Sequence, residues 1–276
     1  MTNRQVIYTC KLVAAGNSPA AVKLHLFLMI TGLKVFKNPY GGDSDTTLYI
    51  GKDHWTVSAD QMTFVLQTLD WLFNVSEDEK SSIKPGPVRN PLPEISSYTG
   101  PADGLANITY GEFMRCEQIY SEMSADASKI SAMISCLWRR RSPGLTPHSH
   151  NYNGDLRTPY NDHLYDRNVK RFSSVSEGEK LAALMFYLGS KLHLSKLYPD
   201  AFSSQGSTEV SKKKTVPLLD HLKVVTTLAG DDITKTEAIM KKNLYEVLSL
   251  MQKLRDQAKA VQEEYDKIKR KNKTKR

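Results

Sequence analysis

Three histidines and three aspartates within residues 147–166 are the best candidates for a metal site in this chain, by residue type and spacing. The segment reads PHSHNYNGDLRTPYNDHLYD, and the six residues are His148, His150, Asp155, Asp162, His163 and Asp166. A His-x-His pair with a distant histidine and carboxylates offers the ligands of zinc or non-haem iron. The segment also contains two prolines, a glycine and four asparagine or serine residues. That composition is typical of a loop, which positions metal ligands poorly, so we expect no metal here.

The sequence GDDITKTE, residues 230–237, is a second candidate for an anion or metal site. It lacks the alternating acids and distal glutamate of an EF-hand, and it has no Gly-Lys-Ser/Thr of a phosphate loop. Thr234 and Glu237 fit a helix-capping box, and Asp231 and Asp232 lie where negative charge favours a helix N-terminus. We therefore predict a helix start. With no nucleotide or serine-hydrolase motif in the chain, we expect no catalytic residue and no cofactor.

Three further hydroxyl residues are each followed three positions later by glutamate or glutamine. The pairs are Ser58 with Gln61, Thr109 with Glu112 and Ser176 with Glu179. In a capping box the hydroxyl accepts from the third backbone N–H, and the acid or amide reaches back to the cap. Each pair precedes an apolar run at helical spacing, so each predicts the start of a helix.

The first 80 residues have the pattern of a small α+β domain. QVIYTCKLV, residues 5–13, is rich in β-branched and aromatic residues and favours a strand. Residues 17–32 predict a helix, with Ser18 as its cap and Pro19 in its first turn. Two short strands around Gly51 and a helix over residues 58–73 complete this domain.

Residues 81–107 contain five prolines and three glycines and little apolar periodicity. Prolines remove backbone donors and disfavour helix at the preceding residue. A structureless stretch of this length is unusual inside one compact domain. We therefore predict an extended linker with little regular secondary structure, which divides the chain in two.

The remainder of the chain, residues 108–270, predicts a helical domain. Apolar residues step by threes and fours over 108–138, over 176–202 up to Pro199, and over 217–230. The last helix is expected to run on from GDDITKTE with a stripe of Leu244, Val247, Leu248, Met251, Leu254, Ala258, Val261, Tyr265 and Ile268. This stripe is longer than one small bundle usually covers. We therefore expect it to bind another chain, through Leu248, Met251, Leu254 and Val261.

The positive charge of the chain is concentrated at its C-terminus. The formal charge is +8, and the last ten residues carry seven bases and no acid, which leaves +1 for the other 266 residues. The candidate phosphate contacts are Lys267, Lys269, Arg270, Lys271, Lys273, Lys275 and Arg276. A nucleic-acid-binding domain would carry its basic excess on the folded surface. We expect a solvated tail at 271–276, with nonspecific binding to nucleic acid as the alternative.

Two other basic triads are separate from this tail. Arg139–Arg141 follows the end of a predicted helix, where cations favour the dipole, and Lys212–Lys214 lies in a polar loop. Cys10, Cys116 and Cys136 fit neither a disulfide framework nor a zinc pattern. No apolar run approaches the roughly 20 residues of a membrane helix, and no secretory signal is visible, so we expect no membrane partner.

Several segments of the C-terminal half are similar to helical proteins from the structural and assembly gene blocks of tailed bacteriophages and prophages of Bacteroidetes. They are ITYGEFMRCEQIY, WRRRSPG, YNDHLYDRNVKRFSSVSEGEKLAALMFYLGS, LYPDAF and LAGDDITKTEAIMKKNLYEVLSLM, within residues 108–255. The resemblance implies a tail assembly chaperone, which keeps the tape measure protein soluble, or a ring, neck or tail-completion protein of the virion. It implies phage structural or assembly proteins as partners, and the bacterial host cytoplasm or the virion as the location.

Together these patterns predict a mainly α protein with a small N-terminal α+β domain, a Pro-rich linker and a C-terminal helical domain that ends in a long helix. The first functional hypothesis is a non-enzymatic phage assembly or structural protein that acts through protein–protein contacts and is oligomeric or in a complex. The alternative is a nucleic-acid-associated protein that uses the basic tail and a winged-helix-like N-terminal unit, which is a fold-level analogy.

Overall fold

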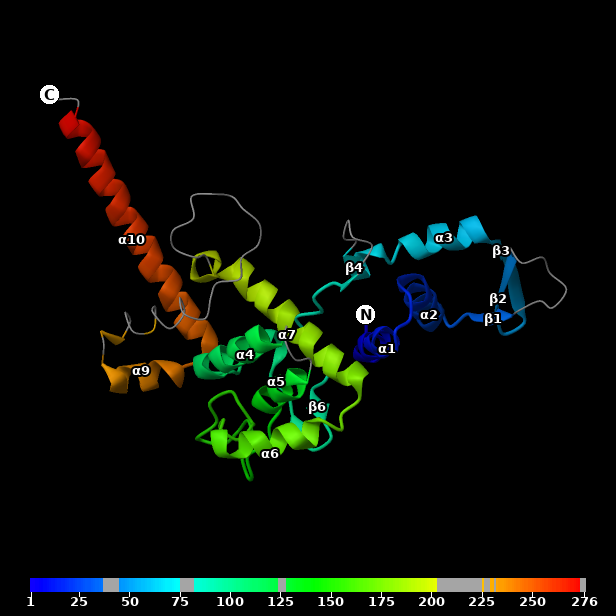
Figure 1. Cartoon of the computed structure of the whole chain (residues 1–276), viewed down its shortest axis with the longest axis horizontal. Coiled ribbons are helices and arrows are strands. Elements are labelled where there is room, and N and C mark those ends of the chain that lie inside the picture. Colours follow the sequence, from blue (N-terminus) through cyan, green and yellow to red (C-terminus); the bar gives the residue numbers. More distant parts are fainter. Residues whose placement is uncertain are drawn as a thin grey trace.

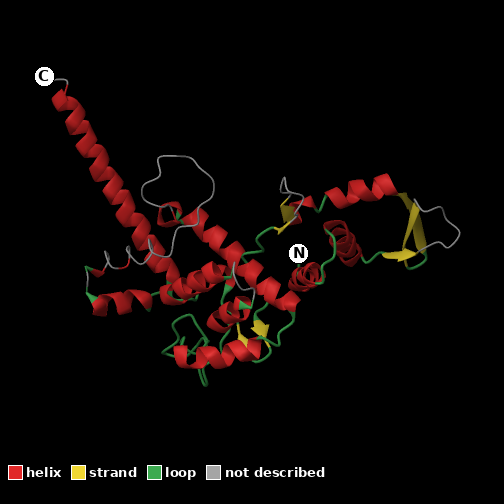
Figure 2. Ribbon diagram, in the orientation of Figure 1, coloured by secondary structure: helices red, strands yellow, loops and turns green. Residues whose placement is uncertain are grey.

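A computed structural model of the whole chain describes residues 1–36, 45–74, 82–123, 128–202, 225, 229–230 and 232–273. As predicted, the protein is mainly helical, with little sheet (Figure 2). A central helical body lies between an N-terminal arm and a long C-terminal helix that points away from it (Figure 1). The helix expected over 217–230 and the triad Lys212–Lys214 fall outside the described residues, except for three positions of the former.

The first element, α1 (Asn3–Ala14), is a helix, so the strand predicted over residues 5–13 is wrong. A capping box of Thr2 and Gln5 starts it, and Val6 and Cys10, four residues apart, are buried. The helix packs along α7 (Glu177–Leu197), which belongs to the C-terminal half. Burial of one helical face against α7 outweighs the β propensity of the sequence.

The rest of the N-terminal arm follows the prediction more closely. Ser18 caps α2 (Pro19–Thr31), and Gly32 ends it in the left-handed conformation. The strands are β1 (Lys34–Phe36), β2 (Asp45–Ile50) and β3 (Asp53–Ser58), in the order β1-β2-β3 and antiparallel, with β2 and β3 joined by the predicted turn. The capping box of Ser58 and Gln61 starts α3 (Ala59–Gln67), and a turn of 3-10 helix (Asp70–Leu72) follows it.

The arm has a small core of its own. The buried residues are Val22, Leu26, Leu69, Leu72 and Phe73. The larger core takes in α1 together with the C-terminal helices. α1 joins the two cores, because Val6 and Cys10 are buried in the larger one while Leu12 and Val13 pack against the smaller one. The predicted N-terminal domain is therefore not separate from the helical body.

The segment predicted as an extended linker is built into the body. Its regular structure is short: β4 (Phe73–Asn74) pairs with β5 (Ser82–Ile83), β6 (Glu94–Ile95) pairs with β7 (Tyr98–Thr99), and a 3-10 turn spans Asp103–Leu105. Leu92, Ile95, Tyr98 and Leu105 are buried in the larger core. The indole N–H of Trp138 donates to the carbonyl oxygen of Leu92 at 2.8 Å. The absence of long elements was predicted correctly, but the linker role was wrong, because distant partners bury this segment.

The apolar stripe over residues 108–138 belongs to two helices and not to one. The Thr109 capping box starts α4 (Tyr110–Glu122), and α5 (Lys129–Leu137) packs against it as a separate helix. α6 (Asp162–Phe172) packs on α5, and Ser176 caps α7, which ends before the 3-10 turn Pro199–Phe202 as predicted. Aromatic rings line the core between them, among them Phe113, Tyr187, Phe186 and Trp138.

The GDDITKTE segment does start a helix, α9 (Ile233–Met240), but its cap is Asp232. The Asp232 carboxylate accepts from the N–H groups of Thr234 and Lys235, so the predicted Thr234 box is wrong. Asp232 is the residue immediately before the helix, so its carboxylate lies within reach of these first N–H groups. Asp231 lies outside the described residues.

The last helix does not continue from α9 but begins again as α10 (Leu244–Lys273). Residues 241–243 between the two helices are held by α4 and the residues before it. The Leu244 N–H donates to the Ile108 carbonyl at 3.0 Å, and the Tyr110 N–H donates to the Lys242 carbonyl at 2.9 Å. These backbone bonds replace helical ones, which is why the apolar periodicity runs on while the helix does not.

Candidate functional site

The candidate metal ligands of residues 147–166 are not brought together in the described part of the chain. His148 and His150 are exposed. Asp155 points into a network of ion pairs instead, and the side chains of Asp162, His163 and Asp166 are not among those described. Within the described residues, no three His, Cys, Asp or Glu side chains are grouped closely enough to hold a metal ion.

Asp155 belongs to a buried network with Glu112, Arg139 and Arg157. Its carboxylate accepts from Arg157 Nε at 2.8 Å and from Arg139 Nη2 at 3.2 Å. Arg139 Nη2 also lies 2.5 Å from Glu112 Oε1. Burial lowers the pKa of Arg139, and the carboxylates of Glu112 and Asp155 oppose that change. The two carboxylates and the two guanidinium groups of this network have equal and opposite formal charges. The network joins α4 to the residues after α5 and to the loop that contains Asp155 and Arg157.

Changing His148 and His150 together to alanine is expected to alter the free energy of unfolding by less than about 0.5 kcal/mol. Both side chains are exposed, and the ion pairs beside them are made by Arg139, Arg157 and Asp155. Urea unfolding of the double variant and of the unchanged chain tests this. One equivalent of zinc or iron in the purified protein, lost in the double variant, would contradict the prediction.

The three cysteines are free and buried. Burial raises the pKa of the Cys10 thiol to about 12 and holds the pKa of the Cys116 thiol well above its ordinary value. A nucleophilic cysteine requires the opposite shift. Cys10 and Cys116 are therefore core side chains without the lowered pKa of a reactive thiol, and Cys136 is buried as well.

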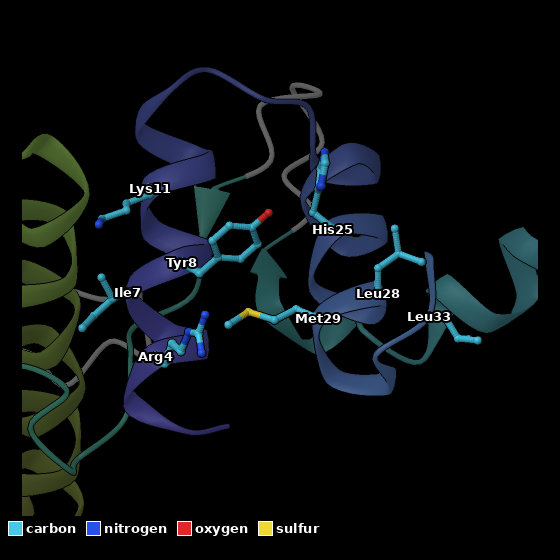
Figure 3. Close-up of a pocket in the computed structure, with 8 residues that line it drawn as sticks. All are labelled: Arg4, Ile7, Tyr8, Lys11, His25, Leu28, Met29 and Leu33. Atoms are coloured by element: carbon cyan, nitrogen blue, oxygen red, sulfur yellow. The ribbon is translucent and has the colours of Figure 1, made fainter. Parts of the chain in front are cut away.

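An open cleft lies between α1 and α2, with a volume of about 640 Å³. Its lining residues are Arg4, Ile7, Tyr8, Lys11, His25, Leu28, Met29 and Leu33 (Figure 3). Tyr8 and Met29 extend into the space between the two helices, whereas Ile7 and Lys11 point towards α7 (Figure 3). The polar groups do not converge on one point, and no carboxylate is among them. This arrangement lacks the convergent polar groups of a catalytic pocket.

Two of the four predicted partner-binding residues are core residues. Leu248 is fully buried and Met251 almost so, both within the larger core of this chain. They are not available to a second protein, so that part of the prediction is wrong. The spacing of the apolar residues predicted the stripe. It does not show which part of the stripe is buried against the rest of the same chain.

The other two predicted residues, Leu254 and Val261, lie on an exposed stretch of the same stripe. Leu254 is 42% exposed, Val261 68%, Tyr265 60% and Ile268 53%. Counted from Met251, the apolar side chains occupy the first and fourth positions of successive heptads. They are Met251, Ala258 and Tyr265 at the first position and Leu254, Val261 and Ile268 at the fourth. This spacing is that of a coiled-coil seam.

Among the described residues, hydrogen bonds and ion pairs to the body are seen along the first half of α10. Lys259 Nζ pairs with Asp200 at 2.6 Å, and Gln252 Nε2 donates to the other oxygen of the same carboxylate at 2.6 Å. The hydrogen bond from Lys259 lowers the pKa of Asp200 most, and the hydrogen bond from Gln252 lowers it further. Beyond Lys259 the helix runs away from the body to the C-terminus (Figure 1). The seam from Val261 onward therefore has no covering element among the described residues.

The basic C-terminal residues continue this helix. α10 extends to Lys273, so the predicted tail at 271–276 begins at least three residues too early. Lys267 and Lys269 are exposed on the helix. The side chains of Arg270, Lys271 and Lys273, and all of Lys275 and Arg276, lie outside the described residues. Lys267 and Lys269 thus lie near the end of a helix that also has an apolar seam.

Comparison of the chain with protein-family models, with curated proteins and with solved structures gave no match. In the part of the chain that the structure describes, no helix is both long and apolar enough to cross a membrane.

Sequence reasoning missed a group of polar residues that gather around Arg139. Ser135, Arg139, Arg140, Arg167 and Asn168 line one small cavity, although they come from different elements. Of these residues, only the Arg139–Arg141 triad was noticed in the sequence. It was interpreted as positive charge at the end of a helix. The pairing of residues 139–142 with 156–158, through bonds such as Thr158 N–H to the Arg140 carbonyl at 2.8 Å, creates this cavity.

Proposed function

We propose that this chain is a non-enzymatic assembly or structural protein that acts through protein–protein contacts made by α10. The observation that supports the proposal is the exposed seam at Leu254, Val261, Tyr265 and Ile268 on a helix that projects from the body. Exposed apolar side chains at heptad spacing gain free energy when a second helix covers them. The resemblance of segments within residues 108–255 to phage proteins supports a role in the assembly of a tailed bacteriophage, with the host cytoplasm or the virion as the proposed location.

The occupant of the seam that we propose is α10 of a second copy, in parallel and in register. Glu264 and Lys269 flank the seam on opposite sides, and both are exposed. In a parallel pair, Glu264 of one helix faces Lys269 of the other, once on each side. An antiparallel pair would instead bring Arg255 and Lys269 on the same flank together, which is repulsive.

The basic residues at the helix end oppose this pairing at low ionic strength. A parallel pair brings the seven bases of one chain beside the seven of the other. Salt screens this repulsion within about 10 Å at 0.1 M. Self-association through the seam should therefore strengthen as salt rises, whereas binding of the same residues to nucleic acid should weaken, because neutralised phosphates release counterions.

Val261→Asp is expected to abolish self-association, because the seam cannot bury an unpaired carboxylate. Its matched control is Ala260→Asp, the neighbouring residue, which is also exposed but points away from the seam. Both changes add one negative charge to the same turn, and neither residue supports the fold. Sedimentation at low and high salt should give a dimer for the unchanged chain and for Ala260→Asp, and a monomer for Val261→Asp.

A monomer at every salt concentration, with Val261→Asp behaving as the unchanged chain does, would exclude pairing through the seam. Binding to DNA that falls steeply with salt, and that is lost when the seven bases at 267–276 are replaced by glutamine, would favour the nucleic-acid hypothesis instead. Far-UV circular dichroism must show the same helix content in all variants, so that a change in assembly is not a change in folding.

A further inference from the structure

A small cavity beside the buried ion network has the properties of an anion site. Its volume is about 100 Å³, and its described lining residues are Tyr98, Ser135, Arg139, Arg140, Thr158, Pro159, Tyr160, Asn161, Tyr165, Arg167 and Asn168. Three of these are arginines, and none of them is an acid. A cavity needs about 10–15 Å³ of this kind of volume to hold one water, so this cavity has room for several waters or for one small anion.

The Ser135 hydroxyl is a buried polar group that has no hydrogen-bond partner among the described residues. Ser135 is 2% exposed, so its hydroxyl is not solvated as a surface group is. A buried polar group left without a partner is destabilising. The guanidinium of Arg139, which lines the same cavity, is paired through Nη2 with Glu112 and Asp155. An acceptor bound beside Ser135 would give this hydroxyl a partner.

Two more arginines line the cavity and are not part of the ion network. Arg139 is paired with Glu112 and Asp155, but Arg140 and Arg167 form no ion pair with any described residue. Arg140 lies over the ring of Tyr98, 5.9 Å from its centroid, and Arg171 Nη1 donates to the Tyr98 hydroxyl at 2.8 Å. Burial acts to raise the pKa of Tyr98, yet these two arginines hold it below its ordinary value, which reports a positive potential at this place.

The geometry points to a binding site for a terminal phosphate group, either free phosphate or a phosphate monoester, lined by Ser135, Arg139, Arg140 and Arg167. A phosphate monoester carries a charge of about −1.5 to −2 at pH 7 and three acceptor oxygens. Arginine donors match such an anion in geometry and charge. A carboxylate has one charge and two oxygens, which are too few acceptors for this set of donors. A phosphodiester offers two free oxygens and cannot enter a cavity of this size end-on.

Calorimetric titration of the full-length protein with inorganic phosphate, against chloride at matched ionic strength, tests the assignment. We expect one saturable site. Arg167→Met should weaken phosphate binding by about tenfold, the loss of one charge-assisted pair. Arg167 is exposed, so its replacement leaves the core unchanged. Ser135→Ala should also weaken phosphate binding, because it removes the buried hydroxyl donor without adding volume.

Arg141→Met is the matched control. Arg141 is in the same triad and exposed, but it is not among the residues that line the cavity. Its affinity for phosphate should stay within about twofold of the unchanged chain, since one exposed charge at this distance contributes little. Equal losses in Arg141→Met and Arg167→Met would mean a diffuse basic surface and would overturn the site.

Three further anions distinguish the sources and the alternatives. Tighter binding of O-phosphoserine than of inorganic phosphate would assign the site to a monoester, and exclusion of O-phosphoserine would assign it to the free ion. Equal binding of dimethyl phosphate or of acetate would overturn the assignment to a terminal phosphate. The absence of any saturable heat with phosphate would do the same.

Discussion

Replacing Arg157 with methionine is expected to lower the free energy of unfolding by about 3–5 kcal/mol. The Arg157 side chain is fully buried and bonds to Asp155 through Nε at 2.8 Å and through Nη2 at 2.9 Å. It also donates to the carbonyl oxygens of Leu137 at 2.6 Å and Asn107 at 3.1 Å. Methionine keeps much of the volume but has no donor. The substitution therefore removes the donor to the Leu137 and Asn107 carbonyls and leaves the Asp155 carboxylate without its two-point arginine partner, with only Asn107, Arg139 and the backbone N–H of residue 157 still donating to it.

Urea unfolding monitored by circular dichroism measures this loss. Arg157→Lys should recover only part of the stability, because an ammonium cannot bond to both oxygens of Asp155 and to two carbonyls in the same plane. Arg141→Met, at an exposed arginine in the strand-like pairing with Arg157, should change stability by less than about 0.5 kcal/mol. A loss below about 1 kcal/mol for Arg157→Met would mean that water reaches this network and that it is not the buried joint described above.

Local patterns of the sequence predicted most helix starts because their causes are local. Ser18, Ser58, Thr109 and Ser176 each accept a hydrogen bond from a backbone N–H three residues on. The strand predicted for α1 failed because residues 5–13 have both β-branched side chains and a helical spacing of buried ones. The choice between them depended on α7, which is more than 160 residues away and whose apolar surface the sequence of α1 does not encode.

The buried segment at residues 84–107 was not predictable from its own composition. Five prolines at 85–101 break regular elements, but they do not decide whether a chain is inside or outside. Burial depends on partners such as Trp138, which is 46 residues away from Leu92 in sequence. The same limit holds for the candidate sites. The seam on α10 could be read from its period, whereas the cavity at Ser135, Arg139 and Arg167 exists only after three segments have met.

Changing Gly189 to alanine is expected to destabilise the protein by about 1–3 kcal/mol, the usual cost of overpacking. Gly189 lies in the middle of α7, and an added Cβ would overlap the Gly86 carbonyl, 2.7 Å from its carbon, and lie 3.2 Å from the Pro87 oxygen. The Gly86 N–H also donates to the Met185 carbonyl at 2.9 Å, so the two backbones are joined at this point. Neither side of the contact is a flexible side chain that could move aside.

The sign of this effect distinguishes a buried segment from a linker. In an exposed helix, replacing glycine with alanine stabilises by about 1 kcal/mol. If residues 84–107 were a solvated linker, Gly189→Ala would therefore raise the midpoint of urea unfolding, and if they pack on α7 as described, it should lower the midpoint. Lys196→Ala, at an exposed site on the same helix, is the control and should change stability by less than about 0.5 kcal/mol. An unchanged dependence on urea concentration in both variants would show that α7 and residues 84–107 unfold together, as one core requires.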